Sequence, residues 1–325
     1  MRTVLLVFLF FTHIYAADEY QLGDGIQVGE LPLYVGGYFS VDYQKTDTST
    51  RYRIDDIALL IYGGINKFSY IAELEFKEFY LRTYTNTTST ITTNDKLYIE
   101  RLYFDYNYDE NILLRLGKYN SPIGFWNLLP VNVLRETTSN PVSTFVLFPK
   151  FTTGIYASYT RFDEEELQVD VIVQNNANLS NAYNNFDVTE HYGLGFSYTL
   201  DDYIFKMNAG HYKKNTQSYY NYALASMKYD TDKYQIMTEM GLQNRDQSNI
   251  RSYAGYIQGL YRFTPKHLGI LRLESYDDKS TNTKDSFAVM GYTYRPVYPV
   301  ALKAEYQAHS LTSQNQVLFS VSVLF

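Results

Sequence analysis

The sequence has no cysteine, one tryptophan, and no long apolar run beyond its first residues. The lack of cysteine excludes disulfides, thiolate metal sites and thiol catalysis. A membrane-spanning helix needs roughly 18 or more apolar residues, so a helical membrane protein is excluded as well. Basic residues are not in excess either: the formal charge of -7 argues against a nucleic-acid-binding protein.

Aromatic residues, by contrast, are abundant. The 325 residues include 35 tyrosines and 20 phenylalanines, which make 17% of the chain aromatic. The mean hydropathy is nevertheless -0.31. This pairing is typical neither of a helical membrane protein nor of an ordinary enzyme core.

The N-terminus differs from the rest of the chain. Arg2 is followed by an unbroken apolar run from Val4 to Phe11, and residues 14–16 form a cleavage site that ends in alanine. This pattern predicts a secretory signal peptide over residues 1–16. A buried N-terminal strand is the alternative, but the pattern changes at once at Asp18.

From Leu33 onward the dominant signal is alternation with a period of two, in segments of about ten residues. In one segment Val169, Val171 and Val173 interleave with Asp170 and polar neighbours. One face of each such strand is apolar and the other is polar. The alternation predicts an all-β protein.

The connections between these segments alternate between short and long. Seven short turns and eight longer connections join sixteen strands, as expected for a transmembrane antiparallel β-barrel over residues 33–325. The first long connections are Lys45 to Tyr52 and Thr85 to Asp95. The third, Tyr119 to Lys150, is the longest and holds four prolines, which favour a fixed path.

A soluble β-sandwich also alternates, so the polar face decides between the two folds. The period-two phase puts nine basic and eight acidic residues on it. They are Lys77, Arg101, Arg115, Lys206, Lys228, Arg262, Arg272, Arg295 and Lys303, against Asp42, Glu73, Glu75, Asp105, Asp170, Glu239, Glu274 and Glu305. So many charges on one face are credible only if that face contacts water, because an uncompensated charge in a dry core costs several kcal/mol.

Two segments carry a resemblance to a known family. The chain ends in an alternating apolar strand whose last residue is Phe325, and this resembles the C-terminal signature of bacterial outer-membrane barrel proteins. The stretch RLGKYNSPIGFWN, from Arg115 to Asn127, resembles the strand-to-loop segment of phosphate-selective porin O/P-like porins. Together they identify the chain as similar to the porin superfamily over most of its length.

The resemblance implies a location, partners and a loop arrangement. The protein would lie in the bacterial outer membrane, in contact with lipid and lipopolysaccharide, as a homotrimer, with Phe325 read by the barrel-assembly machinery. Residues 17–32 would form a short periplasmic segment. The third loop would fold into the lumen and narrow it. The alternative is an outward loop that packs on a neighbouring subunit.

The phase and the loop order together predict a pore constriction. Arg101 and Arg115, on neighbouring strands, are expected near three residues of the preceding strand, with two further charges supplied by the third loop. Those five residues are Glu73, Glu75, Lys77, Arg135 and Glu136. Opposed charges across a narrowing set up a transverse field that orients polar solutes.

Catalysis, metal binding and cofactor binding have little support. The histidines after residue 16 each lie on or near a different segment, with no spacing typical of a metal site. We therefore expect no enzyme, no cofactor and no nucleic-acid partner, but a porin that allows passive diffusion of small hydrophilic solutes or ions. A substrate-specific channel, and a plugged barrel that acts in surface binding or adhesion, are the alternatives.

Overall fold

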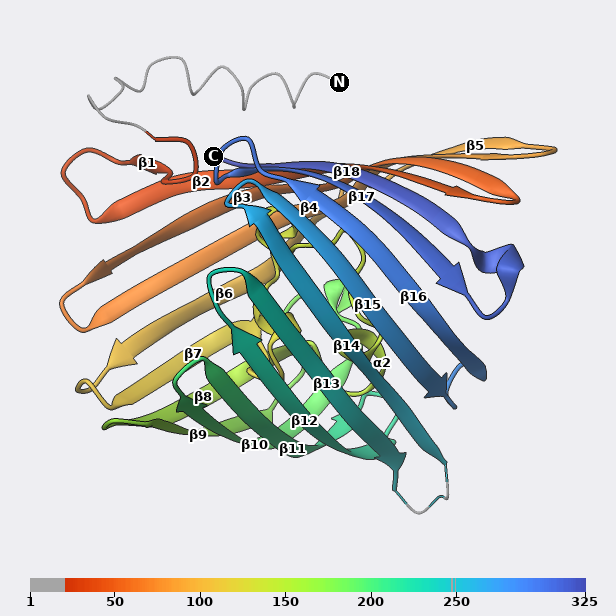
Figure 1. The fold of residues 1–325 in the computed structure, drawn as a ribbon. Helices are drawn as coiled ribbons and strands as arrows, with labels where there is room; N and C mark the ends of the chain where they lie inside the picture. Colours follow the sequence, from red (N-terminus) through yellow and green to blue (C-terminus); the bar gives the residue numbers. More distant parts are fainter. Residues whose placement is uncertain (1–20, 247, 249) are drawn as a thin grey trace.

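A computed structural model describes residues 21–246, 248 and 250–325; the predicted signal peptide lies outside these residues. Long antiparallel strands form one sheet that closes on itself (Figure 1). Closure occurs because β18 hydrogen-bonds to β2, which joins the end of the sheet to its beginning. The predicted fold class, an antiparallel barrel of about sixteen strands, is confirmed.

Sixteen strands form the ring, and two short strands are attached to it. The ring strands are β2 (Leu33–Thr46), β3 (Ser49–Ile65), β4 (Phe68–Thr85), β6 (Leu97–Asn107), β7 (Ile112–Asn120), β8 (Phe151–Phe162), β9 (Glu166–Asn175), β10 (Val188–Leu200), β11 (Tyr203–Lys214), β12 (Tyr219–Asp230), β13 (Tyr234–Arg245), β14 (Arg251–Thr264), β15 (His267–Asp278), β16 (Thr283–Tyr294), β17 (Val300–His309) and β18 (Gln316–Leu324). The attached strands are β1 (Ile26–Gln27), beside β2, and β5 (Ser89–Thr93), beside β4.

Helical turns are confined to the connections among the residues that the structure describes. They are η2 (Trp126–Leu128), η3 (Asn132–Leu134), α2 (Ser143–Val146), η4 (Asn181–Tyr183) and η5 (Thr312–Gln314). In these same parts of the chain, no helix has the length and apolar character of a membrane span.

The strands show the alternation that the sequence predicts. In β15, Leu271 and Leu273 are 50% and 51% exposed, whereas Arg272 and Glu274 between them are buried. Successive strand residues point to opposite sides of a sheet, so one side of the barrel is polar and covered and the other is apolar and bare. This is the reverse of a soluble protein and fits an outer face that contacts lipid.

Two predicted loops are wrong in extent. The first, expected from Lys45 to Tyr52, is a two-residue connection, because β2 continues to Thr46 and β3 begins at Ser49. The Thr46 hydroxyl accepts the backbone N–H of Ser49 at 3.1 Å and closes this turn. Threonine and tyrosine favour strands, so this polar segment extends the sheet instead of leaving it.

The second long connection is likewise mostly strand. β4 continues to Thr85 and folds back as β5, which pairs only with β4 and projects beyond the ring in Figure 1. Leu97, two residues after the predicted connection ends at Asp95, begins β6 and returns the chain to the ring. The polar threonines were predicted as loop, although their branched side chains suit a strand.

The seam of the barrel is closed by the last residue. The Phe325 N–H donates to Gly37 O at 2.8 Å, and the Gly37 N–H donates to Phe325 O at 2.7 Å. A Cβ built at Gly37 would lie 2.9 Å from the Phe325 ring, so the close approach needs glycine there. The terminal aromatic residue therefore belongs to the wall.

The third loop, defined here as residues 121–150 between β7 and β8, carries η2, η3 and α2. Its buried apolar side chains Ile123, Leu147 and Phe148 pack with residues of the strands, among them Tyr212 and Tyr222. The largest apolar core among the described residues thus lies where this loop meets the wall.

Candidate pore lining

Most of the side chains that hold the third loop come from strands between β11 and β18, although Thr152 of β8 and Asn185 also contact it. We call β11, β13, β15, β16, β17 and β18 the anchoring wall, because their polar side chains hydrogen-bond to this loop. At its start, the Gly124 N–H donates to Asn208 Oδ1 at 3.0 Å, and the Trp126 N–H donates to Glu239 Oε1 at 3.2 Å. Near its end, Gln243 Nε2 donates to Val146 O at 2.9 Å.

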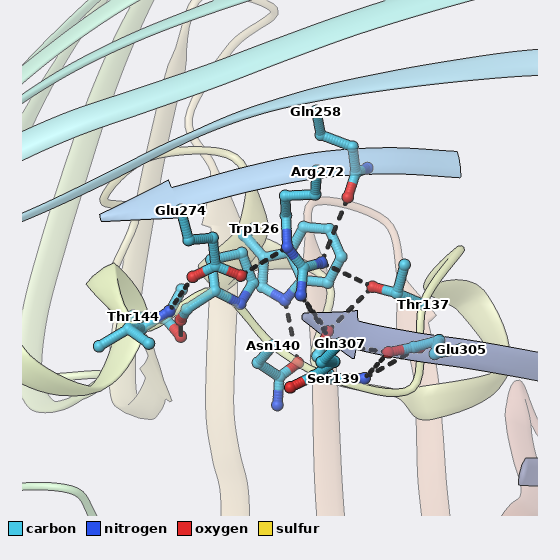
Figure 2. A network of polar contacts seen from close by, with 12 residues as sticks. Trp126, Thr137, Ser139, Asn140, Thr144, Gln258, Arg272, Glu274, Glu305 and Gln307 are labelled. Carbon is cyan, nitrogen blue, oxygen red and sulfur yellow. Dashed lines mark hydrogen bonds and ion pairs between the residues drawn. The ribbon is translucent and has the colours of Figure 1, made fainter. Parts of the chain in front are cut away.

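Arg272 of β15 is the centre of this attachment (Figure 2). Its guanidinium is fully buried; it donates to Glu274 Oε1 at 2.6 Å, and its other nitrogens donate to Thr137 Oγ1 at 2.8 Å and Ser139 Oγ at 2.7 Å. The Trp126 ring lies 5.3 Å from the guanidinium carbon. Planar, rigid donors suit arginine to such a multiple contact.

Strand β17, which is separated from β15 by β16, holds the middle of the loop. Glu305 accepts hydrogen bonds from the backbone N–H of Thr138 and from the N–H and hydroxyl of Ser139, the last at 2.7 Å (Figure 2). The Lys303 ammonium donates to Asn132 O at 2.5 Å and to Asn132 Oδ1 at 2.8 Å. Each buried charge is matched to dipoles of the loop, which is how buried charges are tolerated.

The opposite half of the barrel behaves differently. We call β2, β3, β4, β6 and β7 the self-paired wall, because their charged side chains pair mostly with one another. Arg101 forms an ion pair with Glu73, and Arg115 contacts Asp105 through two hydrogen bonds of 2.6 and 2.8 Å. Among the described residues, no side chain of this wall hydrogen-bonds to the third loop.

Three carboxylates of the self-paired wall surround one phenol. The Tyr38 hydroxyl lies 2.7 Å from Glu73 Oε1 and 3.1 Å from both Glu75 Oε2 and Glu100 Oε2. The Tyr183 hydroxyl of η4 donates to Glu75 Oε2 at 2.8 Å. Like charges held this close are stabilised by shared donors and by nearby cations.

Two cavities of about 410 Å³ each lie along the third loop. The loop-side cavity is lined by charged residues of the self-paired wall and by loop residues that include Pro130 and Arg135. The turn-side cavity lies near the short turns and is lined by Leu129 and Glu136 of the same loop. Neighbouring residues of the loop thus line different cavities.

The structure separates the predicted constriction residues. Glu75, Lys77 and Arg135 line the loop-side cavity, whereas Glu136 lines the turn-side cavity. Glu73 and Arg101 form an ion pair with each other. Tyr38, which lines the loop-side cavity, donates a hydrogen bond to Glu73, so this pair lies beside that cavity. Arg115 pairs with Asp105 and stacks on the Tyr103 ring at 3.9 Å, and it lines neither cavity. Arg135 donates to the Leu129 carbonyl of its own loop at 2.8 Å.

Several lining residues were missed because β-bulges shift the phase. The register of β3 against β4 slips between Ile54 and Asp56, and both Asp55 and Asp56 line the loop-side cavity. The register of β4 against β6 slips at Glu73, which leaves Glu100 as the extra residue on β6. A bulge places two successive residues where alternation allows one. The only sequence signal for these bulges was the presence of two adjacent charged residues in an otherwise alternating strand.

Burial perturbs three titratable groups of the connections. It raises the pKa of Glu136, and it lowers the pKa of Lys150. Burial, reinforced by Glu100 and Glu75, also holds the pKa of Tyr183 well above its usual value. These groups therefore favour their neutral forms more than they would in water. Within the described residues, no group of three histidine, aspartate or glutamate side chains is arranged to hold a metal ion.

No protein-family model and no curated protein sequence matches the chain, but solved structures do. OmpF of Salmonella typhi, in a complex with daunomycin, has a TM-score of 0.62 at 11% identity over 90% of this chain and 97% of its own. The chain has a porin fold. OprB of Pseudomonas putida gives 0.62 at 9% identity over 90% and 93%. An anion-selective porin of Comamonas acidovorans gives 0.60 at 11% over 90% and 99%. At these identities the porin fold is the shared property.

Proposed function

We propose that the protein is an outer-membrane porin that forms a water-filled channel for passive diffusion of small hydrophilic solutes or ions. The observation that carries this proposal is the closed barrel of sixteen strands whose charged side chains cover one face. A barrel of this size is wide enough for an aqueous channel. Its bare apolar face suits outer-membrane lipid and lipopolysaccharide.

The third loop is proposed to lie in the lumen and to narrow it. Its hydrogen bonds to strands from β11 to β18 support this position, because they all reach the polar face. The cavities that it lines would then be the vestibules on either side of the constriction. Arg101, Glu73, Glu75, Lys77 and Arg135 would set the field on one side, and Glu136 on the other. Arg115 would act further from the narrowing.

We propose three further properties of the protein. Residues 1–16 would direct export, Phe325 would be recognised during barrel assembly, and three copies would associate, as in the trimer form of OmpT, an outer-membrane protein of Vibrio cholerae with a similar fold. The likeness to phosphate-selective porin O/P-like porins depends on the segment from Arg115 to Asn127 alone. Ion transport follows only if the lumen conducts.

The test is the conductance of the purified, refolded protein in a planar bilayer under a salt gradient. Steady ohmic steps are expected, and the sign of the reversal potential shows which set of wall charges dominates. Circular dichroism and flotation with liposomes establish folding and insertion independently. Silence from protein that is folded and inserted would contradict the channel.

A plugged barrel is the second candidate, because the third loop bonds to so many strands of the anchoring wall. In that case the projecting β4 and β5 hairpin and the other long connections would be the working surface. Deleting residues 128–146 from the third loop would separate the two. A plugged barrel would begin to conduct, whereas a porin would conduct before the deletion and more strongly after it.

A further inference from the structure

The turn-side cavity has an unusual lining for a charged lumen, because much of it is apolar. Phe125, Leu128 and Leu129 of the third loop line it together with Ile204 of β11 and Met237 of β13. Phe125 and Met237 belong to one buried cluster with Trp126 and Tyr256, and Ile204 packs against that cluster. A sugar or an inorganic ion would leave this apolar surface against water, which is unfavourable.

Two lysines occupy the same cavity without ion pairs. Lys206 of β11 and Lys228 of β12 are diagonal neighbours, since Lys206 pairs with Ser226 in the sheet and diagonal side chains can reach one site. Their ammonium groups lie 5.1 and 5.6 Å from the centre of the Phe125 ring. Neither has a carboxylate within ion-pair distance among the described residues. The sole hydrogen bond given by Lys206 is a long one, 3.5 Å to Gly124 O.

No carboxylate of the described residues forms an ion pair with these lysines. Asp170, Glu239 and Glu166 act electrostatically on Lys206 from farther away, and Asp170 Oδ1 and Glu239 Oε1 already accept hydrogen bonds from other residues. Glu136 lies on the third loop. Oε2 of Glu136 is buried with no hydrogen-bond partner in the described part of the chain. Because burial favours its neutral form, Glu136 opposes an incoming anion less than an exposed carboxylate would.

We propose that the turn-side cavity binds small amphipathic monocarboxylates, with the carboxylate on Lys206 and Lys228 and the apolar body against Phe125, Leu128 and Met237. This deepens the proposed channel function, on which it rests, by naming a solute class that the pore would favour. A neutral apolar solute would leave the two ammonium groups without an ion-pair partner. A small polar anion would leave the apolar side empty. Only a molecule with both parts satisfies both sides.

Binding is measured with benzoate as the probe and with the refolded full chain in detergent. Trp126, the only tryptophan, follows Phe125 directly, so its fluorescence reports on this cavity; titration calorimetry provides a second readout. Benzyl alcohol, which lacks the charge, and acetate, which lacks the ring, should each bind at least about tenfold more weakly than benzoate.

The charge contribution is tested by Lys206→Gln combined with Lys228→Gln. Benzoate affinity should fall by about tenfold or more, because two charge-assisted contacts are lost. The matched control is Lys77→Gln combined with Lys150→Gln, which removes two positive charges from the loop-side cavity. It should leave benzoate affinity within about twofold.

The apolar contribution is tested by Leu128→Asn, at a side chain that is already 42% exposed and so tolerates the change. It should weaken benzoate by about threefold to tenfold and leave acetate unchanged. Equal benzoate affinity in the two lysine double variants, or acetate binding as tightly as benzoate, would overturn the proposal. Conductance of the same preparations is scored separately, so a silent barrel would reject the channel while the titrations still decide the site.

Discussion

The two halves of the barrel carry similar charges but use them differently. On the anchoring wall, Arg272 and Glu305 are buried and form hydrogen bonds with the third loop. On the self-paired wall, Arg101 and Arg115 pair with acids of adjacent strands. The comparison teaches that a charge facing the lumen is not by itself a pore charge. The anchoring wall fixes the loop, whereas the charges of the self-paired wall pair within that wall.

The largest expected effect breaks the anchoring wall at its centre. Arg272→Ala leaves Glu274 buried without its partner and frees the loop at Thr137 and Ser139. Removing one partner of a buried pair costs about 3–5 kcal/mol, so the free energy of unfolding, measured by urea titration in lipid vesicles, should fall by this amount. Single-channel current should become noisy as the loop moves.

The matched variant on the self-paired wall is Arg115→Ala. Its pair with Asp105 is partly exposed, with 22% of the arginine side chain and 11% of the aspartate side chain accessible. Partly solvated pairs contribute about 1 kcal/mol or less, and Arg115 does not touch the third loop. Equal losses of stability for the two variants would show that the distinction between the walls has no energetic basis.

The second prediction sharpens the comparison through selectivity. Arg101→Ala combined with Arg115→Ala removes two positive charges from the self-paired wall and leaves Glu73 and Asp105 uncompensated. The ratio of potassium to chloride permeability should rise by about twofold or more, because nearby unpaired carboxylates favour cations. Reversal potentials in a salt gradient measure the ratio.

Its control removes two arginines that lie away from the proposed constriction. Arg161→Ala combined with Arg251→Ala affects exposed residues at the ends of β8 and β14. The permeability ratio should stay close to that of the wild type, since charges beyond a Debye length of about 8–10 Å are screened by salt. An unchanged ratio in the Arg101 and Arg115 double variant would remove both residues from the pore.

The third prediction concerns the point at which the loop leaves the wall. Gly124 has φ of +66°, and a Cβ there would lie 2.5 Å from Glu239 Oε1 and 3.0 Å from Leu224 Cδ2. Gly124→Ala should therefore lower the free energy of unfolding by about 1–2 kcal/mol, from the left-handed backbone alone, and more if Glu239 must move. Gly259→Ala is the control, because a Cβ there meets nothing within 4 Å. A similar loss of stability in Gly259→Ala would mean that the effect does not depend on the left-handed backbone of Gly124.

The sequence was sufficient for features that depend on local periodicity. Alternation in segments such as Leu271 to Glu274 predicted which side chains share a face, because a strand has a fixed period of two. The short turns were marked by aspartate, asparagine and proline, which favour tight turns for known steric reasons. These signals predicted a barrel of about sixteen strands.

The sequence was not sufficient for features that depend on contacts between segments far apart in the chain. The bulges that bring in Asp55 and Glu100 depend on how one strand meets the next, and a single sequence does not record that register. The partners of the third loop, such as Thr137 with Arg272, are 135 residues apart. The division of the barrel into an anchoring wall and a self-paired wall follows from those contacts and had no local signal.

The smallest expected effect concerns pH. The folded pKa of Glu136 is raised by burial, so its contribution favours the folded state at acidic pH and is lost as the pH rises through the folded pKa. Glu136→Gln removes this dependence. The variant should match the wild type near pH 4 and be modestly more stable at pH 7, by far less than the loss caused by Arg272→Ala. Urea unfolding at both pH values measures the difference, with Glu110→Gln in an exposed turn as the control. A variant less stable than the wild type at pH 7 would mean that the Glu136 carboxylate holds the loop, as Glu239 and Glu305 do.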